Sequence, residues 1–347
     1  MKKMITLTLL LFIVGMKAFA YDICVKNADD VDICYNYINH GRELEVTSGK
    51  GNYQGTIIIP EEVICTDGTF KVTKIGEKAF YNCTTLTSVS IPNSVKTIGI
   101  SAFSGCIAMT SISLGNSITA IDFGAFYCCA SLNEISFPNS ITFIGGESFY
   151  NCKSIKSIKI PYGVSTVGLR TFACCENLIS VDIPNSVTII GDQAFYDCIN
   201  LTSANIPNKV TEIGPYAFME TQLSSVTLPN TLELIGWGAF GCDLSVVISE
   251  IEYPFNIDAH QSFRLSTLEN GTLYVPLGTI DRYKERDGWK EFVNIKEGSP
   301  SHIKNIETYD VSDNKRYTID GRTIKNPQKG INIIQMDNGT TKKVIVK

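Results

Sequence analysis

The sequence predicts a β-rich solenoid: a right-handed coil of about eight 23-residue repeats, with a parallel sheet on one side, a cap at each end and a small β tail. Two observations carry this prediction. A phenylalanine recurs every 23 residues from Phe80 to Phe218, with Phe240 one residue short of the period. A cysteine stands three residues after each of the first six phenylalanines, from Cys83 to Cys198. A fixed period of this length indicates units that bury their apolar faces against their neighbours.

Each repeat is expected to contain a short parallel strand. One unit runs from Ile91 to Ser113 and reads IPNSVKTIGISAFSGCIAMTSIS. Where one unit joins the next, inward apolar residues alternate with outward serines, which is the period of a strand. Pro92 and the polar residues after it predict a turn. The expected strands are Leu86–Ile91, Met109–Leu114, Leu132–Phe137, Ile155–Ile160, Leu178–Ile183 and Leu201–Ile206.

A second extended segment in each repeat, such as Val95 to Ile98, ends at a glycine. The glycine is Gly99 in this unit, and Asp122 takes its place in the next one. A position that accepts glycine and aspartate predicts a positive φ angle. We expect Ser101 to Phe103 to form a single helical turn that directs the ring into the core.

The segments outside the repeats divide the chain further. Residues 1–20 have two lysines, an apolar run and a small-residue end, the pattern of a secretory signal peptide that is too short to span a membrane. No other stretch has transmembrane length. We expect an N-terminal cap segment at 21–69, the solenoid at 70–250, a C-terminal cap at 251–297, and a linker with a β-rich tail at 298–347.

Charge limits the kind of partner. Residues 1–20 hold three of the 30 basic residues and no acidic ones, so the remaining chain has 27 basic and 35 acidic residues, a net charge of −8. A negative chain disfavours nucleic acid as a partner, because phosphates attract basic surfaces.

The six cysteines of the repeats are expected to be reduced, although twelve cysteines in an exported chain would otherwise favour disulfides. Equivalent residues of neighbouring coils lie about 4.8 Å apart with parallel side-chain directions. Their Cβ atoms therefore stay further apart than the ~3.8 Å that a disulfide prefers. A small buried apolar side chain explains these cysteines without redox chemistry.

The remaining cysteines offer one candidate disulfide. Cys128 and Cys174 are expected on turns two coils apart, which is about 10 Å and too far to pair. Cys24 and Cys34 lie in the non-repeat N-terminal segment and are the candidate pair. Cys65 has no evident partner in the sequence.

We expect no enzymatic activity, no cofactor and no metal. The three histidines, His40, His260 and His302, lie outside the repeats and lack metal-ligand spacing. A catalytic cysteine needs a specific base beside it, whereas a cysteine repeated in six coils indicates a structural role. The sequence has no glycine-rich phosphate loop and no nucleophile elbow.

The repeat pattern IP…V..IG..AF..C..L..I.IP resembles the BspA-like leucine-rich repeat family of Bacteroidota surface and secreted proteins. The resemblance covers about residues 70–250 and implies a leucine-rich-repeat coil with adhesive function. Residues 51–60 resemble the N-terminal segment that often precedes such repeats. Residues 273–292 resemble the terminal strand-and-helix unit, whose Tyr283, Trp289 and Phe292 are expected to cover the last coil. The tail resembles the C-terminal sorting segments of exported Bacteroidota proteins.

Two sets of outward side chains are candidates for ligand binding. The first set is rich in hydroxyls and suits a protein or glycan ligand; alternatively, such residues simply suit an exposed parallel sheet. The second set consists of tyrosines beside the core phenylalanines, which either stack on a ligand or pack over adjacent turns. The first set is Ser88, Ser111, Glu134, Ser136, Ser157, Lys159, Ser180, Asp182, Ser203, Asn205 and Ser225. The second set is Tyr81, Tyr127, Tyr150 and Tyr196.

These observations support a leading function hypothesis with two alternatives. The leading hypothesis is an exported, adhesin-like binding protein at the cell surface or outside the cell, with a protein or glycan ligand. The alternative is a structural envelope solenoid in the periplasm with no host ligand. A hydrolase is a third hypothesis, disfavoured because the sequence shows no catalytic constellation.

Overall fold

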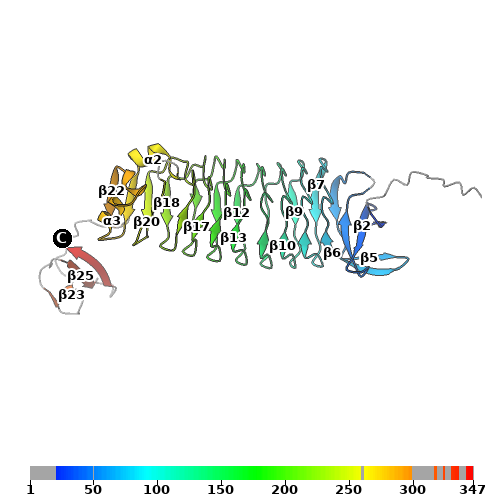
Figure 1. Ribbon diagram of the computed structural model, residues 1–347. Coiled ribbons are helices and arrows are strands. Elements are labelled where there is room, and N and C mark those ends of the chain that lie inside the picture. The colour runs from blue at the N-terminus through cyan, green and yellow to red at the C-terminus, as the bar shows by residue number, and fades with distance from the viewer. Residues whose placement is uncertain are drawn as a thin grey trace, which may run out of the picture. The chain divides into compact units, whose positions relative to one another are not determined.

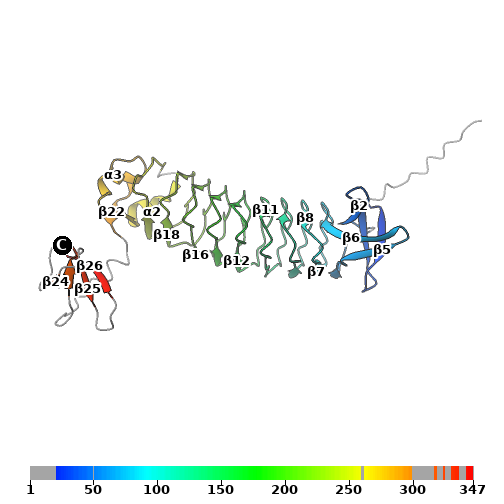
Figure 2. The same ribbon diagram turned by 90° about the horizontal axis from the view of Figure 1, so that it is seen from below.

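The computed structural model describes residues 21–49, 51–258 and 262–298, and the backbone of four strands between residues 316 and 346. The chain divides after Ser299 into two units, which we describe separately. The expected signal peptide lies outside the described residues. The first unit is a β solenoid of about ten turns, which confirms the predicted fold (Figures 1 and 2). Among the described residues, no helix has the length and apolarity needed to cross a membrane.

The N-terminal segment starts both sheets of the coil. Strands β1, β2 and β3 form an antiparallel meander, and β3 continues into a parallel pair with β6. Strand β5 forms a hairpin with β6, whereas β4 pairs in parallel with β7. These strands are β1 (Ile23–Lys26), β2 (Asp32–Ile38), β3 (Glu43–Thr47), β4 (Gly55–Ile58), β5 (Glu62–Cys65) and β6 (Gly68–Ile75).

The first wall of the coil contains the predicted strands, each shorter than expected. All of their pairings are parallel, and the central apolar residue of each strand, such as Val89 or Ile158, is buried. The expected strand at 132–137 is reduced to a single bridge between Ser111 and Glu134. The strands are β7 (Leu86–Ser90), β9 (Ser111–Ser113), β12 (Ser157–Lys159), β14 (Ser180–Asp182), β16 (Ser203–Ala204), β18 (Ser225–Leu228) and β20 (Val246–Ser249).

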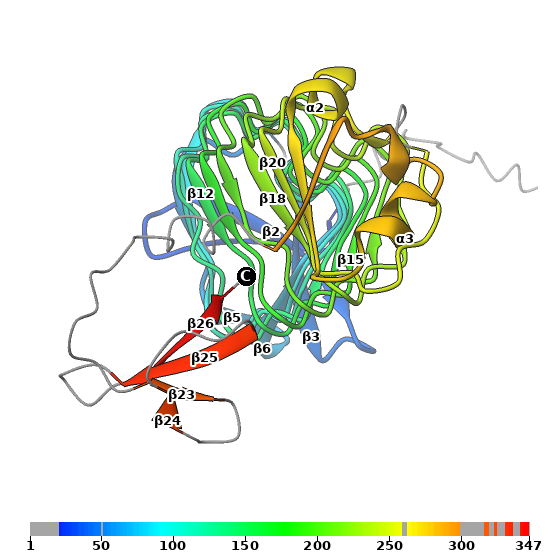
Figure 3. The ribbon, with the colours of Figure 1, turned by 90° about the vertical axis from the view of Figure 1, so that its left-hand side faces the viewer.

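The second wall contains the second extended segment of each repeat. Viewed along the coil, β12 and β15 lie on opposite sides (Figure 3). The strands of this wall are only two residues long and pair in parallel. They are β8 (Thr97–Ile98), β10 (Ala120–Ile121), β11 (Phe143–Ile144), β13 (Thr166–Val167), β15 (Ile189–Ile190), β17 (Glu212–Ile213) and β19 (Leu234–Ile235).

The two walls are joined by an edge of hydrogen-bonded turns instead of the expected helical turn. Three backbone bonds connect each coil to the next along this edge. In one coil, for example, the amides of Lys78, Phe80 and Asn82 donate to carbonyls of the following coil at 2.7–3.0 Å. This edge is therefore as regularly bonded as a sheet, although it is not one.

The predicted positive φ at the repeated glycine is wrong. Gly99 and its equivalents have no positive φ. They are small because the coils approach closely: a Cβ on Gly145 would lie 2.5 Å from the backbone nitrogen of Phe123. The left-handed conformation falls on two other positions of the turn edge. The first comprises Lys78, Ser101, Gly124, Glu147, Arg170, Gln193, Tyr216 and Gly238, and the second comprises Asn82, Gly105, Cys128, Asn151, Cys174, Asp197 and Glu220.

The repeated phenylalanines form a continuous stack in the core. Neighbouring rings are nearly parallel, with centroids 4.8–5.7 Å apart from Phe80 to Phe263. Phe263 is a ninth member of the stack, in a segment where the sequence shows no repeat. The coil thus continues beyond residue 250.

Both ends of the stack are covered by aromatic residues. Tyr53 packs on Phe80 with centroids 4.7 Å apart, and its hydroxyl donates to the carbonyl of Thr47 at 2.8 Å. At the other end, Phe292 packs edge-on against Phe263 at 5.3 Å, next to the buried Trp289. The elements of this cap are α2 (Leu265–Asn270), β21 (Thr272–Val275), α3 (Ile280–Lys284), η1 (Trp289–Glu291) and β22 (Asn294–Glu297).

At a junction between two neighbouring coils, the backbone hydrogen bonds of both walls are missing. The segments that face each other there are residues 132–146 and residues 155–168, and we call this junction the seam. Both facing segments are described, and they share no backbone hydrogen bond; bonding between the coils resumes at Glu147, whose amide donates to the Leu169 carbonyl at 2.8 Å. Neither β9 nor β11 has a strand partner on the far side. Phe137 stands where other coils have isoleucine or leucine, and its ring packs edge-on against Phe149 at 5.5 Å. We attribute the seam to this larger side chain.

The second unit contains one antiparallel sheet in the order β24-β23-β25-β26. All four strands lie in the part of the chain for which the sequence predicts a β-rich tail. The strands are β23 (Arg316–Thr318), β24 (Thr323–Ile324), β25 (Gly330–Gln335) and β26 (Thr341–Val346). A sorting role for this tail stays a prediction.

Candidate functional site

The hydroxyl-rich candidate residues lie on one face of the first wall, which we call the serine face. Because β strands alternate sides, the residues that flank each buried Val or Ile point outward. The strand register places Ser88 beside Ser111, and Ser111 beside Glu134. The seam separates this group from a second one. In the second group, Ser157, Ser180 and Ser203 are aligned. Ser225 belongs to a third group, which begins on β18.

The centre of the serine face carries two adjacent opposite charges. Lys159 on β12 is the register partner of Asp182 on β14, and both side chains are exposed. Within the described part of the chain, neither side chain forms an ion pair. Both charges therefore remain available to a ligand. Glu134 is exposed on the other side of the seam and is not a register partner of Lys159.

Two of the predicted binding residues are engaged within the fold. The hydroxyl of Ser88 donates to the Thr56 hydroxyl at 3.0 Å. The amide group of Asn205 bonds both backbone groups of Ile183: it accepts from the nitrogen at 3.0 Å and donates to the oxygen at 2.7 Å. Asn205 thus replaces a missing ladder bond between two coils, which gives it a structural role that the sequence did not indicate.

A groove interrupts the serine face beside the seam. It has a volume of about 440 Å³ and lies between the coil of β9 and the following coil. Serine hydroxyls and asparagine amides line it together with apolar side chains, so its lining is uncharged. The sequence feature that coincides with this groove is Phe137, the one aromatic residue at its repeat position. The lining residues are Ile112, Ser113, Leu114, Asn116, Ser136, Phe137, Pro138 and Asn139.

Two of the four candidate tyrosines pack over adjacent turns, which is one of the two predicted alternatives; stacking on a ligand stays a prediction. Tyr127 and Tyr150 stack on each other with centroids 4.9 Å apart, so they pack over adjacent turns. A hydrogen bond to Cys174, together with burial, raises the pKa of Tyr150 to about 12. Tyr81 is 46% exposed, whereas Tyr196 is half-buried.

The repeated cysteines are buried free thiols. The Cys106 thiol donates to the Phe80 carbonyl at 3.1 Å, and the next four cysteines of the ladder make the same contact with the phenylalanine of the preceding coil. Burial raises the pKa of the Cys106 thiol to about 12, so the thiol stays protonated at neutral pH. Cys24 and Cys34 face each other across β1 and β2 and form a disulfide.

The described residues show no cluster of side chains that could hold a metal ion. Nowhere in residues 21–49, 51–258 and 262–298 do three His, Cys, Asp or Glu side chains gather closely enough to hold a metal ion. His40 is exposed, and His260 and His302 lie outside the described residues. The serine face offers hydroxyls and the exposed charges of Glu134, Lys159 and Asp182 to a ligand.

Comparison with known proteins agrees with this architecture. The family model described as "BspA type Leucine rich repeat region (6 copies)" matches residues 73–202 and 188–284, more than half of the chain. A comparison with curated proteins gave no match.

Similar solved structures come from several bacteria. A leucine-rich repeat protein from Bacteroides ovatus is 23% identical with a TM-score of 0.50, covering 74% of this chain and 76% of that one. A leucine-rich repeat protein of T. pallidum is 34% identical with a TM-score of 0.48, covering 51% and 81%. A leucine-rich cell surface protein from Faecalibacterium prausnitzii is 22% identical with a TM-score of 0.48, covering 81% and 96%. The family match and the 23-residue coil together lead to one conclusion: the chain belongs to the BspA-type leucine-rich repeat family.

Proposed function

We propose that this chain is an exported, non-enzymatic, adhesin-like protein whose serine face contacts a protein or glycan. The observation that carries the proposal is the register of Lys159 and Asp182, two exposed opposite charges side by side on a rigid sheet. Equivalent positions recur about 4.8 Å apart along the wall, so weak contacts add up along an extended ligand. Charges within such a row set the register and specificity of binding.

Export and surface exposure are part of the same proposal. They are supported by the signal-peptide pattern of residues 1–20 and by the family. The competing function is a structural solenoid in the periplasm. Protease treatment of intact cells separates the two, because only a surface-exposed chain releases repeat peptides without cell lysis.

The serine face is tested by charge reversal. The mature chain is screened against an array of purified matrix proteins and glycans, and any ligand is then titrated against Lys159→Glu. We expect at least tenfold weaker binding, because the reversed charge repels the ligand group that pairs with Lys159.

Lys156→Glu is the matched control. Lys156 is an exposed lysine three residues from Lys159 on the same coil, and it is not one of the serine-face residues. It changes the net charge equally, so a purely long-range effect would weaken binding in both variants. Equal binding by wild type and Lys159→Glu, or equal loss in both variants, would move the site off the serine face.

A further inference from the structure

The outer face of the second wall carries exposed apolar side chains, which we call the apolar band. This wall lies opposite the serine face: viewed along the coil, its strand β15 and strand β12 of the first wall are on opposite sides (Figure 3). Each member of the band is 45–52% exposed. Large apolar side chains that gather in water indicate an interaction site. The band consists of Ile100, Phe123, Phe143 and Leu169.

The apolar band is continuous from coil to coil. Ile100, Phe123 and Leu169 occupy equivalent positions of the repeat, with Gly146 between the last two. A Cβ atom on Gly146 would lie 3.5 Å from a ring carbon of Phe123 and 3.5 Å from the Cβ of Leu169, so these two side chains approach each other over the glycine. Phe143 lies three residues before Gly146 on the same coil. The band therefore spans the seam.

A row of threonines runs beside the band, and their hydroxyls are already bonded within the solenoid. The Thr142 hydroxyl donates to the Thr119 carbonyl at 3.3 Å. The hydroxyls of Thr119, Thr188 and Thr211 donate in the same way to carbonyls of the preceding coil. Burial of a polar group costs free energy when the group loses its hydrogen-bond partner. These hydroxyls keep their partners, so another protein can cover the row at low cost.

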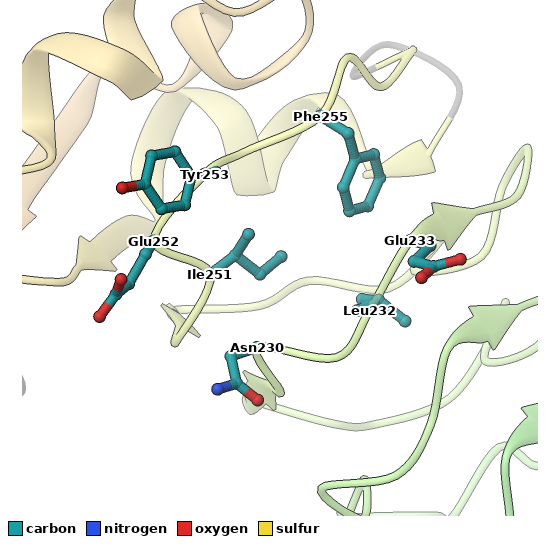
Figure 4. Close-up of a pocket in the computed structure, with 7 residues that line it drawn as sticks. All are labelled: Asn230, Leu232, Glu233, Ile251, Glu252, Tyr253 and Phe255. Carbon is teal, nitrogen blue, oxygen red and sulfur yellow. The ribbon is translucent and has the colours of Figure 1, made fainter.

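Unpaired charges of opposite sign flank the apolar band. Lys96 is exposed at the N-terminal side, directly before β8. Asp192, Glu212 and Glu233 lie on the C-terminal side. Figure 4 shows Glu233 pointing away from the pocket that is lined by Leu232, so its carboxylate faces outward. Within the described part of the chain, none of these four charged side chains forms an ion pair.

The lysines beyond Lys96 at the N-terminal side do not add to this free charge. Lys74 is paired with Glu45 at 3.0 Å, and Lys78 is paired with Glu77 at 3.1 Å. The contrast along the wall is therefore between the unpaired Lys96 and the unpaired acidic residues.

We propose that the apolar band joins two copies of this chain in an antiparallel dimer. A two-fold axis perpendicular to the wall, between Phe143 and Leu169, covers each band with the band of the partner. It also brings Lys96 of one copy to Asp192 and Glu212 of the other. A parallel pair of copies would place equal charges beside each other, which costs free energy.

The shape of the solenoid suits this contact. From β8 to β17 the coils stack in a nearly straight line (Figures 1 and 2), so two walls can meet along their length. Both serine faces stay uncovered, because they lie on the opposite side of the coil. The dimer does not depend on the proposed function of the serine face.

The test is sedimentation velocity on the full mature chain over a wide range of concentration. We expect a reversible equilibrium between monomer and dimer. Phe143→Thr should weaken the dimer by at least about tenfold, because two rings leave the interface at once. The change suits the fold, since Thr97 and Thr166 occupy the equivalent position in other coils of the same wall.

Charge reversal tests the antiparallel arrangement. Lys96→Glu should weaken the dimer by about tenfold, and so should Asp192→Lys combined with Glu212→Lys. The variant with all three changes should recover most of the wild-type affinity, because opposite charges face each other again. Within one copy, Lys96 lies four coils from Asp192 and five from Glu212, about 19 and 24 Å. The recovery therefore requires contact between copies.

Lys159→Glu is the matched control, because it changes the net charge as Lys96→Glu does and lies on the serine face. It should leave the dimer unchanged, and unchanged melting temperatures would show that all variants are folded. The proposal is overturned if wild type is monomeric at every concentration, if Phe143→Thr dimerises like wild type, or if the triple variant stays as weak as Lys96→Glu. A dimer that survives a non-reducing denaturing gel would also overturn it, in favour of a disulfide between copies.

Discussion

Substitution of Phe149 by alanine should uncouple the two halves of the solenoid. The ring is fully buried and contacts three others: Phe126 at 5.1 Å, Phe172 at 5.4 Å and Phe137 at 5.5 Å. A buried Phe→Ala change costs about 3–5 kcal/mol. Because three ring contacts of about 0.5–1.5 kcal/mol each are lost, we expect a value near the upper end.

The location of Phe149 makes the effect more than a loss of stability. In a solenoid, cooperativity depends on the contacts between neighbouring coils. At the seam these contacts lack the backbone bonds of both walls, so the core stack and the turn edge carry the coupling. Without the ring of Phe149, the coils before and after the seam should unfold at different denaturant concentrations.

Urea unfolding followed by two signals detects this separation. The chain has two tryptophans, Trp237 and Trp289, and both lie after the seam, so fluorescence follows the C-terminal half while far-UV circular dichroism follows the whole array. The two transitions should coincide in wild type and separate in Phe149→Ala.

Phe195→Ala is the control, because its ring is equally buried but lies where the second wall is continuous from β13 to β19. It should lower the midpoint and leave the two signals coincident. Coincident transitions in Phe149→Ala, or the same separation in Phe195→Ala, would refute the role of the seam.

Three further predictions concern the thiols, the disulfide and the C-terminal cap. Burial raises the pKa of the Cys106 thiol to about 12 and that of Cys242 to about 11, whereas unfolded thiols ionise near pH 8.5. Stability is therefore complete below about pH 8.5 and should decline as the pH rises toward 11; a flat midpoint across that range in urea titrations would contradict it. Reduction of the Cys24–Cys34 disulfide should destabilise the N-terminal cap by about 2–4 kcal/mol, and identical melting curves with and without reductant would argue against it. Tyr283→Phe removes buried hydrogen bonds to Ser249 and Ile251 and should cost about 1–3 kcal/mol, whereas the exposed Tyr162→Phe should leave the urea midpoint unchanged.

The sequence predicted the solenoid because its core is periodic. The spacing of Phe80 and its successors determines which residues meet in the stack. The same spacing placed the serines of β7 beside those of β9, and the serine of β12 beside that of β14. The ninth ring, Phe263, was missed because the polar and cysteine positions around Phe240 lose the pattern. Its spacing of 23 residues from Phe240 was the remaining signal.

Other features depend on contacts that a repeat pattern does not record. The glycine position was assigned a positive φ from residue preference, but the close approach of the neighbouring backbone explains it. The seam depends on how one ring, Phe137, fits between coils. The path of residues 251–255 depends on hydrogen bonds from the C-terminal cap, in a segment where the sequence has no periodicity.

The left-handed positions of the turn edge have a consequence for how this protein changes over time. The eight residues of the first position are Lys78, Ser101, Gly124, Glu147, Arg170, Gln193, Tyr216 and Gly238, and seven residue types occur among them. Their backbone is fixed by hydrogen bonds between coils. For example, the amide of Lys78 donates to the Ile100 carbonyl, and the amide of Arg170 donates to the Asp192 carbonyl. The coil therefore imposes the backbone conformation, while the type of side chain varies from coil to coil. Mutations can rewrite the chemistry of this edge one coil at a time while the fold, and any binding surface elsewhere on it, is inherited intact.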